Sequence, residues 1–519
     1  MNASTERSTS LWMATAAIEP APPLTQDANA DVAIIGAGIA GLSAAYELAQ
    51  AGKRVIVIDR GPLAGGMSAR TTAHLAAELD DFYSEHIRLR GEREARLYYE
   101  SQTAAIDRIE EIQRAEAIDC DFRRVTGFLI RAAETDVELL EREFEACRQI
   151  GVKGIAWGET PWQGEDDPRC LCFPDQARFH PLKYLDGLLR CIRRDGGHLF
   201  SETAATRLEE RDGSVVITTA DGPVLYADAA IVATNCPVND RIAIHTKQAP
   251  YRTYVIAARV PKGAVHDALC WDTLDPYHYV RLQPDADAAH DWLISGGEDH
   301  KSGHGRDQHE RFVRLEAWTR SRAPQLGAIE YRWSGQVMEP VDYAPYVGRN
   351  PGDRRIFVVT GDSGQGMTTG AMAGMLLRDL VLERPTRWTD VYLPQRVTLR
   401  AAGEYLRENA DVAGHVAQHL GSAEIASADE LAPGQGGIVG RGLHKVAAYR
   451  DEAGKLHARS AACTHAGCIV QWNPFETCWD CPCHGSQFSI DGEALAGPAI
   501  RPLASVSIED EKQPAAASS

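Results

Sequence analysis

The sequence has no long apolar run. No segment of its 519 residues approaches the ~18 apolar residues that a transmembrane helix needs. Residues 1–30 also lack the basic start and the continuous apolar core of a secretory signal peptide. Both absences argue against a membrane span, and we expect a cytoplasmic protein.

Positive charge is scarce, since 54 Lys and Arg face 73 Asp and Glu and leave a formal net charge of -19. Such a chain is repelled by nucleic acids and by anionic membranes, so neither is expected as a partner. The twelve cysteines are too few for a disulfide framework over this length, and five of them fall between 463 and 483. The length itself predicts two or three domains.

A dinucleotide-binding pattern is present near the N-terminus. Residues 31–60 read as a strand, a glycine-rich turn with Gly36, Gly38 and Gly41, a helix that Ile39 and Ala40 open, and a second strand that ends at Asp59 and Arg60. Gly36 permits the tight turn, Gly38 lets a pyrophosphate approach the backbone, and Gly41 lets helix and strand pack closely. Asp59 is placed to accept hydrogen bonds from the adenosine ribose.

Two later segments favour FAD over NAD as the dinucleotide. One is a strand that ends in Ala233-Thr234. The other is a strand, a glycine turn and a helix over 356–374, where Gly361, Gly364, Gln365, Gly366 and Met367 form the turn and the helix start. Such a turn directs backbone N–H groups at a flavin edge where negative charge develops. A generic strand-to-helix turn is the alternative.

Together with Arg70-Thr71-Thr72 after the second strand, these segments resemble the D-amino-acid oxidase and dehydrogenase (DadA-like) superfamily of FAD enzymes over roughly 31–385. The resemblance implies an α/β fold in which a Rossmann-like FAD-binding domain (31–90, 176–245, 346–385) alternates with a substrate domain on an antiparallel sheet (91–175, 246–345). It also implies that the residues named in these motifs bind FAD.

Some members of the superfamily attach FAD covalently. Attachment through a cysteine before the last glycine motif is excluded here, because no cysteine occurs between 271 and 462. A related group uses a histidine soon after the second strand, and His74 lies in that region. The alternative for His74 is a packed histidine near the pyrophosphate.

Two boxes near the C-terminus each combine cysteine with histidine: Cys463-Thr-His465-Ala-Gly-Cys468 and Cys481-Pro-Cys483-His484-Gly-Ser486. Two sulfurs and two imidazoles can bind tetrahedral zinc or a mixed-ligand [2Fe–2S] cluster. Ordinary zinc knuckles use arms of two cysteines, whereas each arm here supplies one Cys and one His. The pattern therefore favours iron, with zinc or a structural cysteine cluster as alternatives.

The boxes resemble those of quinol-oxidising Rieske proteins. The resemblance implies Cys463, His465, Cys481 and His484 as cluster ligands, a Cys468–Cys483 disulfide, and a small antiparallel β domain over 425–510 that follows a helical connector (386–424). Ser486 keeps a hydroxyl that tunes such clusters, whereas Phe488 replaces a tyrosine and predicts a lower potential. Residues 1–30 are expected to form an extension and 511–519 a disordered tail.

Joined together, the two ends predict an FAD-dependent oxidoreductase that oxidises an amine or amino acid by hydride transfer to flavin. Its Rieske cluster would pass the electrons one at a time to an external acceptor. The catalytic residues stay unknown, and Tyr254, Tyr279 and Arg281 are candidates by position that could equally be cross-strand pairs.

Four alternatives compete with this function. An NAD(P)H-driven reductase needs a second GxGxxG, and none follows residue 41. A Rieske oxygenase needs an iron site after the cluster, and only about 35 residues follow His484. A reductase fed by a protein partner and a redox sensor both stay open.

Overall fold

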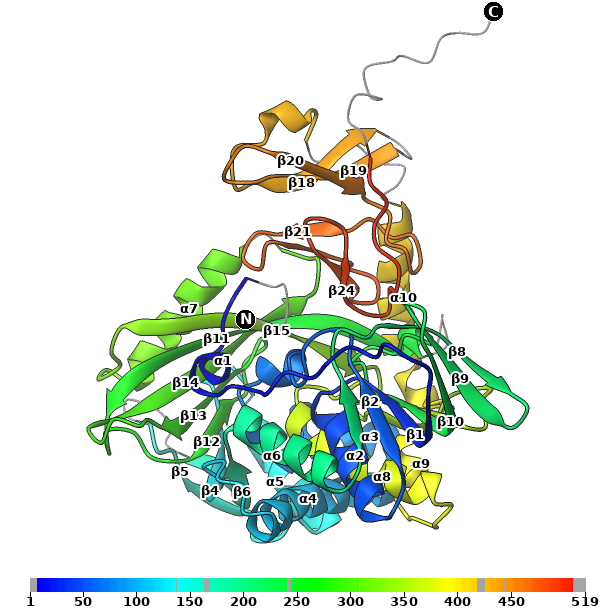
Figure 1. Cartoon of the computed structure of the whole chain (residues 1–519). Coiled ribbons are helices and arrows are strands. Elements are labelled where there is room, and N and C mark those ends of the chain that lie inside the picture. The colour runs from blue at the N-terminus through cyan, green and yellow to red at the C-terminus, as the bar shows by residue number, and fades with distance from the viewer. Residues whose placement is uncertain are drawn as a thin grey trace, which may run out of the picture.

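The structure is a computed structural model that describes residues 7–136, 138–162, 169–239, 244–305, 307–417, 425–441 and 444–506. Two large sheets and their helices form the lower body in Figure 1, and a small β domain lies above them. The predicted tail 511–519 and the end of the predicted connector lie outside the described residues. Among the described helices, none is both long enough and apolar enough to cross a membrane.

The first sheet has a parallel centre. Its strands follow the order β16 (Tyr346–Arg349), β17 (Ile356–Thr360), β10 (Val224–Val232), β1 (Ala28–Ile35), β2 (Val55–Ile58) and β7 (His198–Phe200), and the hairpin β8 (Ala205–Arg211) and β9 (Ser214–Thr219) extends from β10. The strands β17, β10, β1, β2 and β7 are mutually parallel. Their centres are short apolar runs such as Val-Ile-Val-Ile in β2, because both faces of a parallel sheet are covered.

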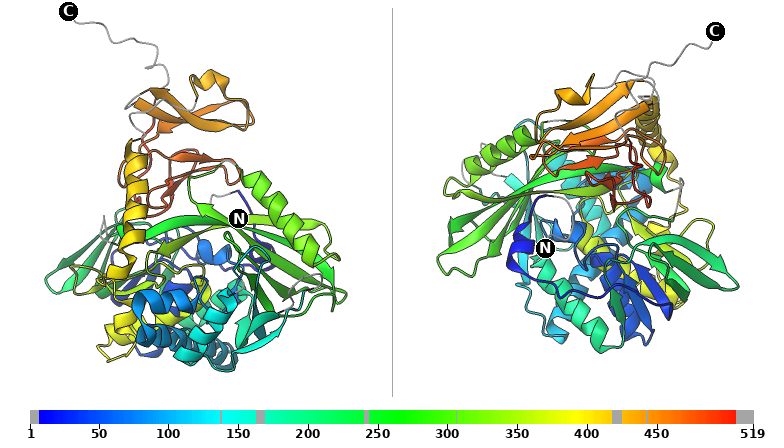
Figure 2. Two further views of the ribbon diagram at one scale, coloured as in Figure 1. Left: turned by 180° about the vertical axis from the view of Figure 1, so that it is seen from behind. Right: turned by 45° about the horizontal axis from the view of Figure 1, so that its top comes forward.

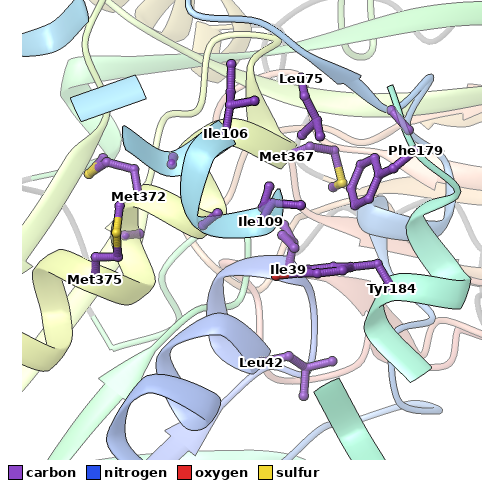
Figure 3. Close-up of a cluster of buried hydrophobic side chains, with 14 of the residues drawn as sticks. Ile39, Leu42, Leu75, Ile106, Ile109, Phe179, Tyr184, Met367, Met372 and Met375 are labelled. Carbon is purple, nitrogen blue, oxygen red and sulfur yellow. The ribbon is translucent and has the colours of Figure 1, made fainter. Parts of the chain in front are cut away.

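Helices cover this sheet. They are α2 (Ile39–Gln50), α4 (Glu92–Ala115), α6 (Pro181–Arg194) and α8 (Gly366–Val381). Figure 3 shows Ile39 and Leu42 of α2 in the apolar cluster that also contains Ile106 and Ile109 of α4 and Met372 of α8. This core fixes where the first turn of α2 and the first turn of α8 stand.

The second sheet is almost entirely antiparallel and forms a layer beside the first. Its order is β15 (Ile329–Pro340), β11 (Gln248–Pro261), β14 (His290–Lys301), β13 (His278–Pro284), β12 (Leu269–Asp272), β4 (Arg123–Ile130), β6 (Arg169–Arg178) and β3 (His74–Leu75), and β5 (Ala156–Glu159) pairs with β6. Only β12 and β4 pair in parallel among the pairings described. The remaining helices of the body are α3 (Tyr83–Arg90), α5 (Leu139–Ile150), α7 (Gln308–Arg322) and α9 (Thr389–Tyr392).

The small domain consists of two antiparallel sheets. The outer one contains β18 (Gly436–Arg441), β19 (His444–Arg450) and β20 (Leu456–Ser460), and the inner one contains β21 (Gln471–Asn473), β22 (Cys478–Asp480), β23 (Gln487–Phe488) and β24 (Ala494–Ala496). Helix α10 (Ala402–Ala417) stands beside this domain in both views of Figure 2 and leads the chain up from the body.

The predicted fold class is confirmed, but the chain moves between the two layers at other points than expected. Residues 74–75 (β3) already pair with β6 of the second sheet, although 31–90 was predicted as FAD-binding. Helix α4, predicted in the substrate segment, packs on α8 with its apolar face. The apolar stripe of α4 marks it as a surface helix but does not say which layer it covers.

The N-terminal extension is also part of the body. Helix α1 (Leu11–Thr15) places Trp12 in the core, where its indole Nε1 donates to the Thr71 carbonyl (2.5 Å) and its ring meets His180 edge-on at 4.9 Å. Ser10 donates through Oγ to the Ala69 carbonyl at 2.6 Å. The extension therefore braces the segment that follows β2.

Buried ion pairs join the small domain to the body. Arg70 Nη1 lies 3.2 Å from Glu476 Oε1 with both side chains fully buried, and Arg252 Nη2 lies 3.1 Å from Asp480 Oδ1. Ser334 Oγ and Ser8 Oγ each donate to Glu476 Oε1 at 2.6 Å. Burial raises the pKa of Glu476, but Arg70 and Arg252 more than offset this, so the pKa is lowered overall.

We predict that Glu476→Gln destabilises the protein by about 3–5 kcal/mol, because removing one partner of a buried pair leaves its charged neighbours uncompensated. The check is thermal or denaturant unfolding compared with Glu452→Gln, which alters an exposed carboxylate of the same domain. Equal stability of the two variants would contradict the role of Glu476.

Candidate active site and metal centre

A cavity of about 660 Å³ lies where the two sheets and the small domain meet. Its wall includes the turn after β1, the segment after β2, the end of β10 and the turn between β17 and α8. Strands β11, β13 and β15 of the second sheet supply another side, and Gln487 and Ala494–Ala496 of the small domain close the rest. Three parts of the chain thus share one cavity.

The glycine turn at one end of the cavity has the geometry that the motif predicts. Gly36 has φ +104°, and a Cβ there would lie 2.3 Å from the Ala233 carbonyl oxygen. A Cβ on Gly41 would lie 1.9 Å from the Gly36 carbonyl oxygen. Only glycine lets α2 begin this close to β1, which directs the N-terminus of the helix at the cavity.

Asp59 holds this turn in place. Its two carboxylate oxygens accept hydrogen bonds from the backbone N–H groups of Ala37 (2.7 Å) and Gly61 (2.9 Å). Arg60 donates through Nη2 to the Leu495 carbonyl of the small domain at 2.5 Å. The adenosine end of the predicted dinucleotide site is therefore fixed partly by a residue more than 400 positions away.

Most predicted FAD-binding residues line the cavity: Gly36, Gly38, Ile39, Ala40, Asp59, Arg60, Arg70, Thr71, Thr72, Ala233, Thr234, Gly364, Gln365, Gly366 and Met367. Gly41 and Gly361 are not in the wall and instead shape the turns behind it. Arg70 lines the cavity, and its guanidinium donates to Glu476, Ser8 and the Ser334 carbonyl.

The three catalytic candidates are separated by the structure. Tyr279 lines the cavity, and its hydroxyl is 2.6 Å from Thr253 Oγ1. Tyr254 is buried outside the wall, with its hydroxyl 2.9 Å from His300 Nε2. Arg281 is fully buried and donates to the Ala73 and Phe179 carbonyls at 2.6 and 2.9 Å. Neither of the last two lines the cavity: Arg281 joins two backbone segments, and the Tyr254 hydroxyl is bonded to a side chain.

The iron–sulfur boxes form two loops whose cysteines and histidines come together. The first loop joins β20 to β21 and the second joins β22 to β23. The rings of His465 and His484 lie 5.0 Å apart, and Cys468 and Cys483 form a disulfide between the loops. Hydrogen bonding from the Cys481 thiol, the His465 N–H and the Ser486 hydroxyl lowers the pKa of Cys463 to about 7 despite burial.

These residues suit a metal. The His484 Nδ1 is buried and makes no hydrogen bond within the described chain. Burial, with repulsion from His465 and His245, lowers the pKa of His484 to about 3, so the ring is neutral and its nitrogen is available as a ligand. A neutral imidazole at His484 is the protonation state that an iron cluster requires.

The body packs directly against these loops. The His245 ring lies 5.0 Å from that of His465 and 5.8 Å from that of His484. Gln336 of β15 donates through Nε2 to the Gly485 carbonyl at 2.9 Å, and the Cys236 thiol lies 3.6 Å from the His484 carbonyl oxygen. The predicted cluster edge is therefore covered by the body.

Comparison with known families matches this geometry. The family model for FAD dependent oxidoreductases (DAO) matches residues 31–380, and the Rieske [2Fe-2S] domain model matches residues 422–507. The chain belongs to the DAO family of FAD-dependent oxidoreductases. It carries a C-terminal Rieske domain, which confirms the [2Fe–2S] interpretation of the boxes over zinc.

Relatives cover most of the chain. A Rieske 2Fe-2S iron-sulfur protein of Bacillus subtilis, YhfW, is 32% identical over 96% of this chain and 97% of its own length. The gamma-glutamylputrescine oxidoreductase of Escherichia coli is 28% identical over 73% of this chain and 89% of its own. Among solved structures, glycine oxidase from Geobacillus kaustophilus has a TM-score of 0.61 at 20% identity and covers 71% of this chain and 99% of its own.

For this oxidoreductase, His74 has the environment of a packed histidine. It lines the cavity, its Nδ1 is 3.1 Å from Thr72 Oγ1, and its Nε2 is 3.4 Å from the Val280 carbonyl oxygen. Burial and the nearby Arg281 lower its pKa to about 3. Because both ring nitrogens already have partners, the contacts favour packing over covalent attachment of FAD.

The sequence reasoning missed a set of acidic side chains in the cavity wall. Glu78, Asp80, Asp299 and Asp362 all line it. Burial raises the pKa of Asp80 and of Asp362 to about 6 and that of Asp299 to about 7. Asp362 follows Gly361 in the glycine turn and could have been noticed there, whereas the others come from segments without a motif.

We predict that Gly41→Ala greatly lowers the FAD content of the purified protein, because the new Cβ would meet the Gly36 carbonyl and force α2 away from β1. Overpacking of this kind costs about 1–3 kcal/mol or more. The measurement is the flavin-to-protein ratio, with Gly403→Ala, where a Cβ meets no atom within 4 Å, as the control. Full FAD content in Gly41→Ala would contradict this role.

A second prediction concerns the cluster. Ser486→Ala should lower the reduction potential of the [2Fe–2S] cluster, because the hydroxyl that donates toward the Cys463 sulfur stabilises the reduced state. A potentiometric titration followed by EPR measures the shift. Ser489→Ala, whose hydroxyl accepts from backbone groups of a nearby turn, should leave the potential unchanged. An unchanged potential in Ser486→Ala would exclude this contribution.

Proposed function

We propose that this protein oxidises an amine or amino acid at FAD and passes the electrons singly through its Rieske cluster to an external acceptor. The observation that carries the proposal is the shared cavity. Gln487, three residues after the predicted ligand His484, lines the same space as the FAD-binding turns. A cluster domain that closes a flavin cavity is well placed to exchange electrons with it.

A short connection between the two centres runs through Gln336. Gln336 lines the cavity and is 2% exposed. Its Nε2 donates a hydrogen bond to the carbonyl of Gly485, the residue after His484. On strand β23, Gln487 Nε2 donates a hydrogen bond to Asp480 Oδ1 at 2.9 Å, and Asp480 forms an ion pair with Arg252. Both routes consist of buried hydrogen bonds, and these hold the cluster loop at a fixed position against the cavity wall.

When bound, FAD would supply an acceptor for the hydride from the carbon beside the substrate nitrogen, and the cluster would supply a one-electron carrier. The chain itself supplies orientation, water exclusion and proton acceptors. The second sheet offers Tyr279 and Thr253 as a hydrogen-bonded pair in the wall. The acidic groups nearby have pKa values raised by burial, so they can take up a proton near neutral pH.

Relatives support the substrate class and the coupling. One relative is named a gamma-glutamylputrescine oxidoreductase, which favours amine oxidation. The similarity to the Bacillus subtilis Rieske protein extends over both parts of the chain, which supports a single functional unit. We place the protein in the cytoplasm, and the thiols that the structure describes outside the disulfide support this location.

The test is anaerobic mixing of the purified protein with amines, N-methylated amino acids and D-amino acids, one compound at a time. With a true substrate, flavin absorbance should fall and the rhombic EPR signal of the reduced cluster should follow. In Gln336→Leu the flavin step should keep its rate and the EPR signal should appear more slowly. Flavin bleaching with an oxidised cluster would refute the coupling, and cluster reduction by a protein donor alone would favour the partner-fed reductase.

A further inference from the structure

One end of the cavity carries a concentration of negative charge. Glu78 and Asp80 come from the loop after β3, Asp299 from β14 and Asp362 from the turn after β17, and all four line the wall. Asp81 and Glu339 lie behind them and share Ser363, whose hydroxyl is 3.2 Å from Asp81 Oδ2 and 2.5 Å from Glu339 Oε2. Four separate parts of the chain therefore bring carboxyl groups to the same place.

No positively charged side chain of the described wall forms an ion pair with these acids. Its cationic residues are Arg60 and Arg70, together with His74. Arg60 donates to the Leu495 carbonyl at the far end, Arg70 is paired with the buried Glu476, and His74 is hydrogen-bonded through both nitrogens. A substrate carboxylate at this end would find acids and no cation to bind it.

The acids do not form a preformed metal cage. In the ranges that the structure describes, no three carboxylate oxygens from different residues come within 4.8 Å of one another, and the single group that meets this criterion consists of Cys468, Cys481 and Cys483. The carboxyl groups are spread around a space instead of converging on a point. This arrangement suits a molecular cation better than a metal ion.

Aromatic rings complete the same end. Tyr277, Tyr279 and Trp271 line it, and the two tyrosine rings lie 5.3 Å apart. Tyr277 donates its hydroxyl to Asp80 Oδ2 at 2.8 Å. Rings beside carboxylates attract an organic ammonium group through their faces as well as through charge.

Glu78 is the most telling of the four. It is 3% exposed and lines the cavity, and burial with repulsion from Asp80 and Glu143 raises its pKa, which a hydrogen bond from the Trp271 side chain offsets only in part. A buried carboxylate without a cation is unfavourable unless it takes up a proton or a positively charged partner. The cavity supplies the space for such a partner.

We propose that the substrate is a cationic amine without a carboxylate beside the reacting carbon, and that Glu78, Asp80 and Asp299, with the tyrosine rings, bind its ammonium group. This inference rests on the proposed function and narrows it: α-amino acids are disfavoured, because their carboxylate would face these acids. Amines whose other end is neutral or positively charged fit the same space.

The same carboxyl groups can accept the proton that an amine substrate must lose before it is oxidised. Transfer of a hydride from the α-carbon requires the neutral amine, so the bound ammonium must first give one proton to a carboxylate, which becomes a carboxylic acid. Burial raises the pKa of Asp80 to about 6 and that of Asp299 to about 7, which brings both within range of this exchange.

Two probes that cannot be dehydrogenated isolate binding from chemistry. Tert-butylamine and 2-aminoisobutyrate both lack an α-hydrogen, and they differ only in that a carboxylate replaces one methyl group. Each is titrated into the oxidised holoprotein at neutral pH while flavin absorbance and melting temperature are followed. We expect tert-butylammonium to bind at least about tenfold more tightly, a difference of about 1.4 kcal/mol.

Single substitutions test which carboxyl groups bind the ammonium group. Glu78→Gln and Asp299→Asn should each weaken tert-butylammonium binding by about tenfold, and Asp299→Asn gives the answer if Glu78→Gln does not fold. Asp228→Asn, which changes an exposed carboxylate on β10, should leave it unchanged. Equal or tighter binding of 2-aminoisobutyrate, or no binding of either probe, would overturn the inference. Neither result depends on electron transfer to the cluster, so a failure of the coupling would be seen separately.

Discussion

The pairing of Arg70 with Glu476 and of Arg252 with Asp480 is the constraint on which the architecture depends. An apolar interface would allow the Rieske domain to slide, whereas buried charges tolerate only the geometry in which every charge has its partner. Ser8 and Ser334 add hydrogen bonds to Glu476, so the N-terminal segment and the second sheet are tied to the same carboxylate. The N-terminal segment, the second sheet and the Rieske domain are thereby fixed relative to one another.

That position makes the Rieske domain a structural part of the flavin site. Strand β24 lies over the adenosine end, where the Leu495 carbonyl accepts from Arg60. On the other side of the same domain, His245 of the body lies against the rings of both predicted histidine ligands. The predicted cluster loops are consequently held in one place against the body, and Gln487 of the same domain reaches the cavity wall.

Local patterns were readable from the sequence, and long-range partners were not. The close approach at Gly41 depends on the Gly36 carbonyl only five residues away and could be anticipated from the motif, and α4 and α6 followed from apolar spacing. Arg70 was expected at FAD because it lies in the right motif, but its partner Glu476 is 406 positions further on. For Arg281 and Tyr254 both a catalytic and a structural interpretation stayed open for the same reason, since strand alternation shows a face and not its neighbours.

Buried charge has two opposite uses in this molecule. At the domain interface each carboxylate meets an arginine, and the result is rigidity. In the cavity, Asp80 instead accepts hydrogen bonds from Tyr277 and Gln365, and none of Glu78, Asp80 and Asp299 forms an ion pair with an arginine among the described residues. Every carboxylate named at the interface has an arginine partner, whereas these acids of the cavity have none in the described chain. A positively charged ligand would neutralise them. The substrate end of the cavity is therefore marked by carboxyl groups that form no ion pair with a cationic side chain of the described wall.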